Sequence, residues 1–176
     1  MVNFSLILFA ESEAVYTDGG VLAEFSWLLV VLPFFAALLI TFFGKYLPMK
    51  GAEVALLTIG SIFIYSVLLM YLHITQGIAN EFFVNVGSIG QFDIEFGWVV
   101  DGLSIMMYFV VGTVALLVFI YATNYMQGEI RYTFFFTSLT LFAGSMLVLV
   151  SSPTLIQILI GWELVGVCSY LLIGHY

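Results

Sequence analysis

Long apolar runs, separated by short segments that carry most of the charges, set the pattern of this chain. Each run has roughly 20 residues, the length that an α-helix needs to cross a hydrocarbon core ~30 Å thick. The runs are Phe25–Phe43, Ala52–Leu72, Leu103–Asn124, Tyr132–Val150 and the segment from Pro153 to the end of the chain. The pattern predicts an all-α polytopic membrane protein with about five transmembrane helices.

The long connection between the second and third runs, Thr75–Asp101, has a different pattern. Within it, residues 82–100 (FFVNVGSIGQFDIEFGWVV) alternate between apolar and other positions around Gly87, Gly90 and Asp93. Alternation with period two, interrupted by turn-forming residues, is typical of a β-hairpin. We therefore expect an outer-face β-hairpin between transmembrane helices 2 and 3.

The few basic residues predict the orientation of the chain. Lys45 and Lys50 lie between the first two spans and Arg131 lies between the third and fourth, so all three fall on one side. The positive-inside rule places that side in the cytoplasm and the acidic N-terminus outside. Trp98 and Tyr71 are then expected as aromatic anchors at the outer headgroup level.

Composition excludes several classes of protein. Hydrophobic residues make up 63% of the 176 positions and charged residues 8%, which excludes an ordinary soluble domain. Three Lys and Arg residues give no nucleic-acid footprint, and a single cysteine, Cys168, provides neither a disulfide nor a metal-ligand pair. The chain has no phosphate-binding loop, dinucleotide fingerprint, CxxC pair or HExxH motif. We expect it to bind no cofactor and no metal.

Glu163 is the only charge in the last run and the leading candidate for a functional residue. It lies roughly 15 Å along a helix from Pro153, near the middle of the bilayer. An acidic side chain there costs about 2.5–3.5 kcal/mol, so such residues usually face a protein interior and mark an ion or proton path. The functional interpretation is a protonatable relay carboxylate. The alternative is a structural acid hydrogen-bonded to a neighbouring helix.

The surroundings of Glu163 support the first interpretation in part. The residues that share its helical face are Leu159, Ile160, Gly166, Val167 and Tyr170. Gly161 and Gly166 would let another backbone approach closely, which suits an interior face. No Lys or Arg lies inside any predicted span, so a counter-charge for Glu163 must come from sequence beyond this chain or from another subunit.

Other polar residues are weaker candidates. His175 and Tyr170 are secondary site candidates, and His73 could also shuttle protons, although an interfacial position is the favoured explanation of both histidines. Asp101 precedes the third span and is expected to cap it. Cys168 is expected to be a small filler in a helix interface.

Two stretches of the chain resemble a known family. Residues 96–150 (FGWVVDGLSIMMYFVVGTVALLVFIYATNYMQGEIRYTFFFTSLTLFAGSMLVLV) resemble the N-terminal region of the large antiporter-like subunit of respiratory complex I. In bacteria this is NADH-quinone oxidoreductase subunit L, and in mitochondria NADH dehydrogenase chain 5. The following IQILIGWELVGVCSYLLIGHY is similar to the next helix of that family, with the signature GWE-x-VG-x-CSYLLIG.

The resemblance implies a translocase, in which this subunit transfers protons and does not carry the redox chemistry. NADH, FMN, iron–sulfur clusters and quinone are expected in partner subunits, and the partners are other membrane-arm subunits of complex I and the lipid bilayer. Glu163 occupies the position of the family's functional glutamate, which pairs with a lysine on a later helix. The implied location is the bacterial cell (inner) membrane.

Two alternatives are a large subunit of an Mrp-type sodium/proton antiporter and a non-catalytic structural bundle. Because the chain ends close to its last span, we expect a fragment of a longer protein. The expected organisation is a peripheral N-terminal segment (1–24), two helices and the hairpin (25–95), a chain 5 N-terminal-type region (96–151) and the start of a proton-translocating antiporter-like domain (152–176).

Overall fold

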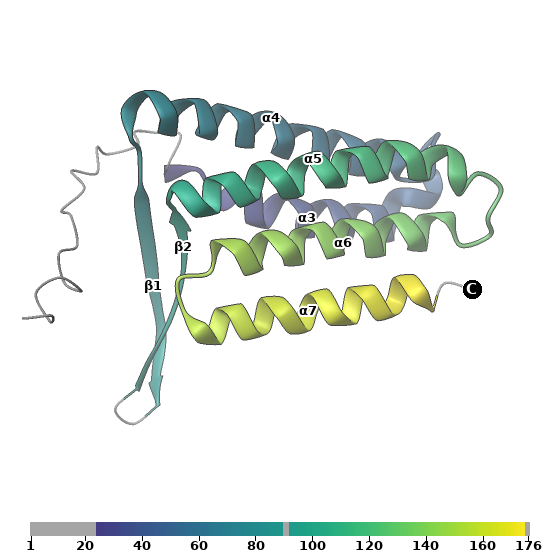
Figure 1. The fold of residues 1–176 in the computed structure, drawn as a ribbon. Coiled ribbons are helices and arrows are strands. Elements are labelled where there is room, and N and C mark those ends of the chain that lie inside the picture. Colours follow the sequence, from purple (N-terminus) through teal and green to yellow (C-terminus); the bar gives the residue numbers. More distant parts are fainter. Residues whose placement is uncertain (1–23, 90–91, 175–176) are drawn as a thin grey trace, which may run out of the picture.

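The computed structural model describes residues 24–89 and 92–174 of the chain. It contains five long helices, each long and apolar enough to cross a membrane, which confirms the predicted number of spans (Figure 1). They are α3 (Trp27–Phe43), α4 (Ala52–Gln76), α5 (Gly102–Tyr125), α6 (Tyr132–Ser151) and α7 (Leu155–Ile173). A short 3-10 turn, η1 (Gly44–Tyr46), extends α3.

The five helices run roughly parallel or antiparallel to one another, with α6 near the middle (Figure 1). Helix α6 packs extensively against α3 and α7, and also against α5 and α4. Helix α4 packs against α5 and α3. Helix α7 packs along α6 at the edge of the bundle, so one side of it remains uncovered by these five helices.

The predicted hairpin is confirmed. Strands β1 (Asn80–Ile89) and β2 (Phe92–Val100) pair antiparallel, with a bulge between Asn85 and Gly87. The hairpin crosses the ends of the helices where α4 ends and α5 and α7 begin (Figure 1). Trp98 stacks on Phe82 with ring centroids 4.8 Å apart and is partly buried against the core. It therefore fastens the hairpin to the bundle, and its place at the outer headgroup level stays a prediction.

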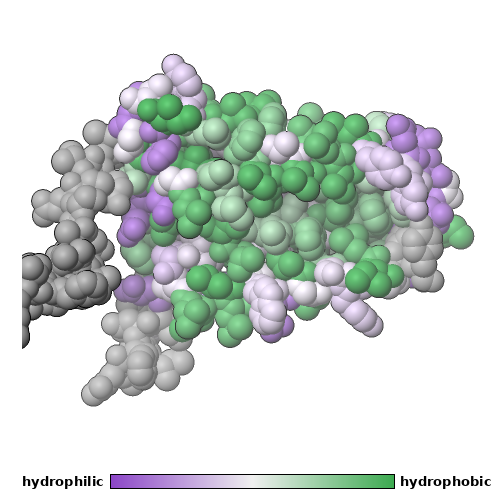
Figure 2. Space-filling model, viewed as in Figure 1, coloured by the Kyte–Doolittle hydropathy of each residue, from purple (hydrophilic) through white to green (hydrophobic). Residues whose placement is uncertain are grey.

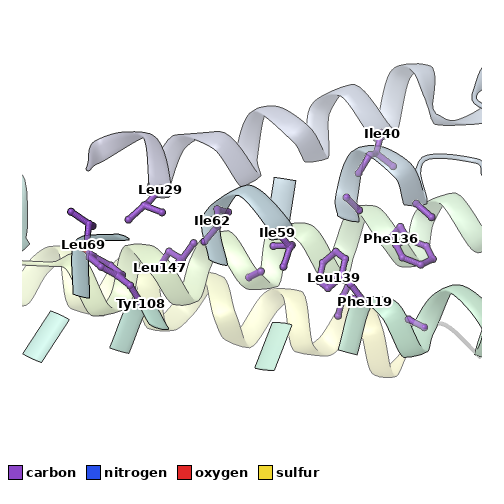
Figure 3. Packing of buried hydrophobic residues seen from close by; sticks show 14 of the residues in the cluster. Leu29, Ile40, Ile59, Ile62, Leu69, Tyr108, Phe119, Phe136, Leu139 and Leu147 are labelled. Carbon is purple, nitrogen blue, oxygen red and sulfur yellow. The ribbon is translucent and has the colours of Figure 1, made fainter. Parts of the chain in front are cut away.

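The surface and the interior of the bundle are both apolar. Figure 2 shows apolar side chains over the middle of the face in view and polar ones at its two ends. Such a belt suits a lipid environment. Inside, side chains from α3, α4, α5 and α6 meet in one cluster that includes Leu29, Ile59, Tyr108, Phe136 and Leu147 (Figure 3).

The loops and helix ends also follow the sequence pattern. The Thr133 hydroxyl donates to the Lys50 carbonyl oxygen at 3.1 Å, so the two loops with the basic residues meet at one end of the bundle. At the opposite end, Asp101 caps α5: its carboxylate accepts from the Ser104 N–H at 2.7 Å, and the Ser104 hydroxyl accepts from the Asp101 N–H at 2.8 Å. This capping box confirms the role expected for Asp101.

Candidate functional site: the Glu163 face of α7

Helix α7 carries the leading candidate, and its first turn is held by local and long-range contacts. Thr154 is the N-cap, and its hydroxyl accepts from the Gln157 N–H. The same hydroxyl donates to the Glu95 carbonyl oxygen of β2 at 3.2 Å. The start of α7 is therefore joined to the hairpin as well as to α6.

A buried amide makes the main connection between α7 and the hairpin. The Gln157 side chain accepts from the Gly97 N–H at 2.9 Å and donates to the Gly97 carbonyl oxygen at 2.8 Å. Both backbone groups of Gly97 point to the edge of β2 that no strand of the described residues covers, and the amide pairs them as a neighbouring strand would. Gln157 is only 7% exposed.

We call this pair of hydrogen bonds the Gln157–Gly97 clamp. Gln157 is not among the site residues predicted from the sequence. The signal that could have found it is an amide in an apolar run, four residues before Gly161 and thus on the same helical face.

The covered face of α7 is narrow and built from small or polar residues. Its fully buried members are Gln157, Gly161 and Cys168. A Cβ added to Gly161 would lie 3.0 Å from Leu149 Cα, so the backbones of α6 and α7 approach closely there. Cys168 lies 3.8 Å from the Ser145 oxygen, which confirms its expected role as a filler in a helix interface.

Glu163 lies on the opposite side of α7. It is the ninth of the 19 residues of the helix, counted from Leu155, and so stands near mid-span. It follows Gly161 by two residues, or about 200° around the helix, and its side chain is exposed on the bundle. Among the described residues it has no ion pair and no side-chain hydrogen bond, and no basic residue faces it.

The residues predicted to share the Glu163 face do share it, and they are uncovered. The exposed fractions are 55% for Leu159, 54% for Val167 and 75% for Tyr170, and Gly166 is exposed as well. We call this the Glu163 face. Within the described part of the chain it is not an interior face, because α6 covers the other side of α7.

The prediction that Gly161 and Gly166 both serve one interior face of α7 was wrong. The two glycines are five residues apart, about 140° around the helix, and do not serve one contact. Gly161 meets α6, whereas a Cβ added to Gly166 would meet nothing within 4 Å. Only Gly166 lies on the Glu163 face, where a further helix could approach closely.

Of the weaker candidates for a functional residue, the structure places only Tyr170 on the Glu163 face. Tyr170 follows Glu163 by two helical turns on the same face, about 10 Å along the axis. His175 lies outside the described residues. His73 is at the hairpin end of α4, where its Nδ1 lies 2.7 Å from the Ile78 carbonyl oxygen, and it is not on the Glu163 face.

The described part of the chain was expected to offer few metal-ligating side chains close together. No group of three or more His, Cys, Asp and Glu side chains comes together there in a way that could hold a metal ion. What the Glu163 face offers is a single protonatable group in the middle of a membrane-spanning helix, with a tyrosine two turns away.

A substitution at Gly161 tests whether the close approach of α6 holds α7 in this orientation. We expect Gly161→Val to displace α7 from α6, since the added side chain would overlap the Leu149 backbone. Overpacking of this kind costs about 1–3 kcal/mol. The thermal stability of the complete protein in its membrane should fall by a corresponding amount. Gly60→Val, in the middle of α4, is the matched control and should be close to neutral, because a Cβ added there meets no atom of the described chain within 4 Å.

Comparison with known proteins shows what this chain is similar to. A family model described as NADH-ubiquinone oxidoreductase (complex I), chain 5 N-terminus, matches residues 87–136, from the hairpin through α5 into α6. NAD(P)H-quinone oxidoreductase subunit 5 of the organellar chromatophore of Paulinella chromatophora is 41% identical over 160 residues, or 87% of this chain. NAD(P)H-quinone oxidoreductase chain 5 of Synechocystis is 40% identical over 164 residues, and the chloroplastic subunit 5 of Glycine max is 36% identical over 160.

The fold and the site define a multi-pass integral membrane protein with a carboxylate at mid-span. The comparisons then confirm the resemblance predicted from the motifs: over most of its length the chain is similar to chain 5 of complex I-type NAD(P)H-quinone oxidoreductases. The alignments cover 24% of the Paulinella and Synechocystis relatives, so the chain spans about a quarter of the length of the curated relatives it matches.

Proposed function

We propose that the protein to which this chain belongs is a proton-translocating membrane-arm subunit of an NADH:quinone oxidoreductase. In this proposal NADH oxidation and quinone reduction occur elsewhere in the complex and drive proton transfer through this subunit. Glu163 is the proton relay. The observation that carries the proposal is the position of Glu163, at mid-span and on a face that the five helices leave uncovered.

The energetics of that position support a partner on the Glu163 face. A carboxylate turned toward lipid at the bilayer centre costs about 2.5–3.5 kcal/mol, and a facing cation or water-filled path removes that cost. The described chain contributes neither. All three Lys and Arg residues lie at one end of the bundle, in the connections between α3 and α4 and between α5 and α6. A helix that covers this face and carries a basic residue would complete the site, with Gly166 allowing it to approach.

In the proposed mechanism, Glu163 alternately pairs with the cation of the covering helix and separates from it. When the cation approaches, Glu163 is ionised, and when the cation withdraws, Glu163 takes up a proton. A close ion pair is worth about 4 kcal/mol at an effective dielectric constant of ~20. Moving one charge across the membrane costs about 2.3 kcal/mol per 100 mV, so pairing on this scale is sufficient to drive a proton step.

The proposal extends to partners, cofactors and location. The partners are other membrane-arm subunits of complex I, and NADH, FMN, iron–sulfur clusters and quinone are bound by partner subunits. The names of the relatives as NAD(P)H-quinone oxidoreductase subunits support this assembly. We place the protein in the bacterial cell (inner) membrane.

Inverted membrane vesicles test the proposed function. We expect vesicles that contain the complete protein to build a proton gradient on addition of NADH and a quinone, and vesicles from a deletion strain to lose most of it. The gradient and quinone reduction should be recorded together. A proton gradient that requires the protein and is driven by imposed sodium, with no dependence on NADH or quinone, would instead indicate an Mrp-type antiporter.

A further inference from the structure

Helices α5 and α6 enclose an apolar groove that the proposed proton path does not use. The groove has a volume of about 240 Å³. Val110, Val114 and Val118 of α5 line one side, and Leu139, Phe142 and Met146 of α6 line the other. Val114 is 55% exposed, so the groove opens to the surroundings of the bundle along its length.

A second cavity continues this groove toward the hairpin end of the bundle. It has a volume of about 400 Å³, and its lining is mixed: Val99, Leu103, Met107 and Val150 are apolar, and Asp101, Ser104 and Ser152 are polar. Met107 lines both cavities, so the two adjoin. Together they form a site that is apolar along the membrane span and carries a few polar groups at its hairpin end.

The hairpin end of this site carries negative charge, and the carboxylate of Asp101 there is only partly hydrogen-bonded. One oxygen of the Asp101 carboxylate accepts from the Ser104 N–H, and the other has no partner among the described residues. The His73 ring lies beside Gly102, but its Nδ1 is hydrogen-bonded to the Ile78 carbonyl oxygen, and it forms no ion pair with Asp101. Glu81 and Glu95 of the hairpin add negative charge at this end, whereas Lys45, Lys50 and Arg131 lie at the other.

The walls of the groove favour a flexible chain over a helix. Helix–helix contacts in membranes are enriched in small residues that let two backbones approach. Here the two walls are valine, leucine, phenylalanine and methionine, and the small residues Ala115 and Ala143 lie between them. A space of this kind fits an acyl chain lying along the helices better than it fits a helix some 10 Å across.

We propose that α5 and α6 bind one phospholipid with an ethanolamine-type headgroup. Its acyl chain lies in the groove, and its ammonium group donates to the free oxygen of Asp101 in the adjoining cavity. The net negative charge of that end disfavours an anionic headgroup. A choline headgroup carries the charge but has no N–H to donate, so the site discriminates between the two zwitterionic classes.

Lipid retention by the intact complex tests the proposal. The complete protein, in its membrane complex, is reconstituted with equal parts of phosphatidylethanolamine, phosphatidylcholine and phosphatidylglycerol, then purified in mild detergent, and each class is counted by mass spectrometry. We expect about one retained phosphatidylethanolamine per protein. Ala115→Phe, which fills the groove, should lower its retention on the order of tenfold, or ~1.4 kcal/mol. Ile120→Phe, on an exposed part of α5 outside the groove, should leave it unchanged.

The headgroup contact is tested separately. Asp101→Asn keeps the acceptor that caps α5 and removes only the charge, so the preference for phosphatidylethanolamine over phosphatidylcholine should disappear while α5 stays capped. A photoreactive benzoyl-phenylalanine at Val114 should form an adduct with phospholipid. An adduct with a polypeptide would mean that a helix covers the groove and would overturn the proposal, as would unchanged lipid retention in Ala115→Phe.

Discussion

Replacing Glu163 by glutamine is expected to abolish NADH-driven proton pumping while the complex stays assembled. Glutamine has nearly the shape of glutamate but cannot take up or release a proton, so a relay that passes through this position is interrupted. General acid–base groups contribute factors of about 10² or more, and we expect the initial rate of proton uptake to fall at least tenfold. The measurement is the proton gradient in inverted vesicles supplied with NADH and quinone, with quinone reduction followed in parallel.

The matched control for this change is Glu129→Gln. Glu129 lies in the exposed loop between α5 and α6, outside the helices, and the substitution is chemically the same. It should leave pumping unchanged, which separates loss of the relay from a general effect of removing a negative charge. If Glu163→Gln pumps at the wild-type rate, Glu163 is a structural acid and the proposed mechanism is wrong.

Replacing Gln157 by leucine is expected to loosen the hairpin from α7. The leucine keeps most of the volume but leaves the Gly97 N–H and carbonyl without the partners they have in the clamp. Each unsatisfied buried group costs about 1–3 kcal/mol, so for the two groups we expect a loss of about 2–6 kcal/mol in the local stability of the hairpin contact. Hydrogen exchange of the Gly97 amide in the complete protein measures this loss directly, as faster exchange.

Three further variants sharpen that result. Gln157→Glu keeps an acceptor for the Gly97 N–H but turns a buried carboxylate oxygen toward the Gly97 carbonyl oxygen, so its effect should be at least as large as that of Gln157→Leu. Gly97→Ala should be at least as damaging as Gln157→Leu, because the added Cβ would overlap the Phe82 carbonyl oxygen. Gln127→Leu, in the exposed loop after α5, is the control. Unchanged protection of Gly97 in Gln157→Leu would show that the clamp contributes nothing to the docking of the hairpin.

Structural features that depend only on residues close together in the sequence could be predicted from the sequence. A run of about 20 apolar residues is long enough to span the bilayer wherever its neighbours lie, so the spans and their number follow from the chain alone. The Asp101 cap joins residues three apart, and the hairpin between β1 and β2 joins adjacent segments. The position of Glu163 at mid-span is also a matter of counting residues.

The covered and uncovered sides of α7 could not be predicted in the same way. A helix in a membrane is apolar toward lipid and toward other helices alike, so its hydrophobic pattern does not mark the packed face. Leu159 and Ile160 are exposed while Gln157 is buried, which reverses the order expected in a soluble protein. For this reason Gly161 and Gly166 were assigned to one contact although they serve different sides.

The sequence by itself determined the membrane class, the five spans, the hairpin and the mid-span carboxylate, because each depends on length, period or spacing within one segment. Only the tertiary structure decided that Gly161 packs on α6, that Glu163 faces away from the bundle, and that Gln157 clamps Gly97 across a separation of 60 residues. These depend on which segments meet in space, and an apolar helix surface leaves that choice to close packing and to the pairing of buried backbone groups.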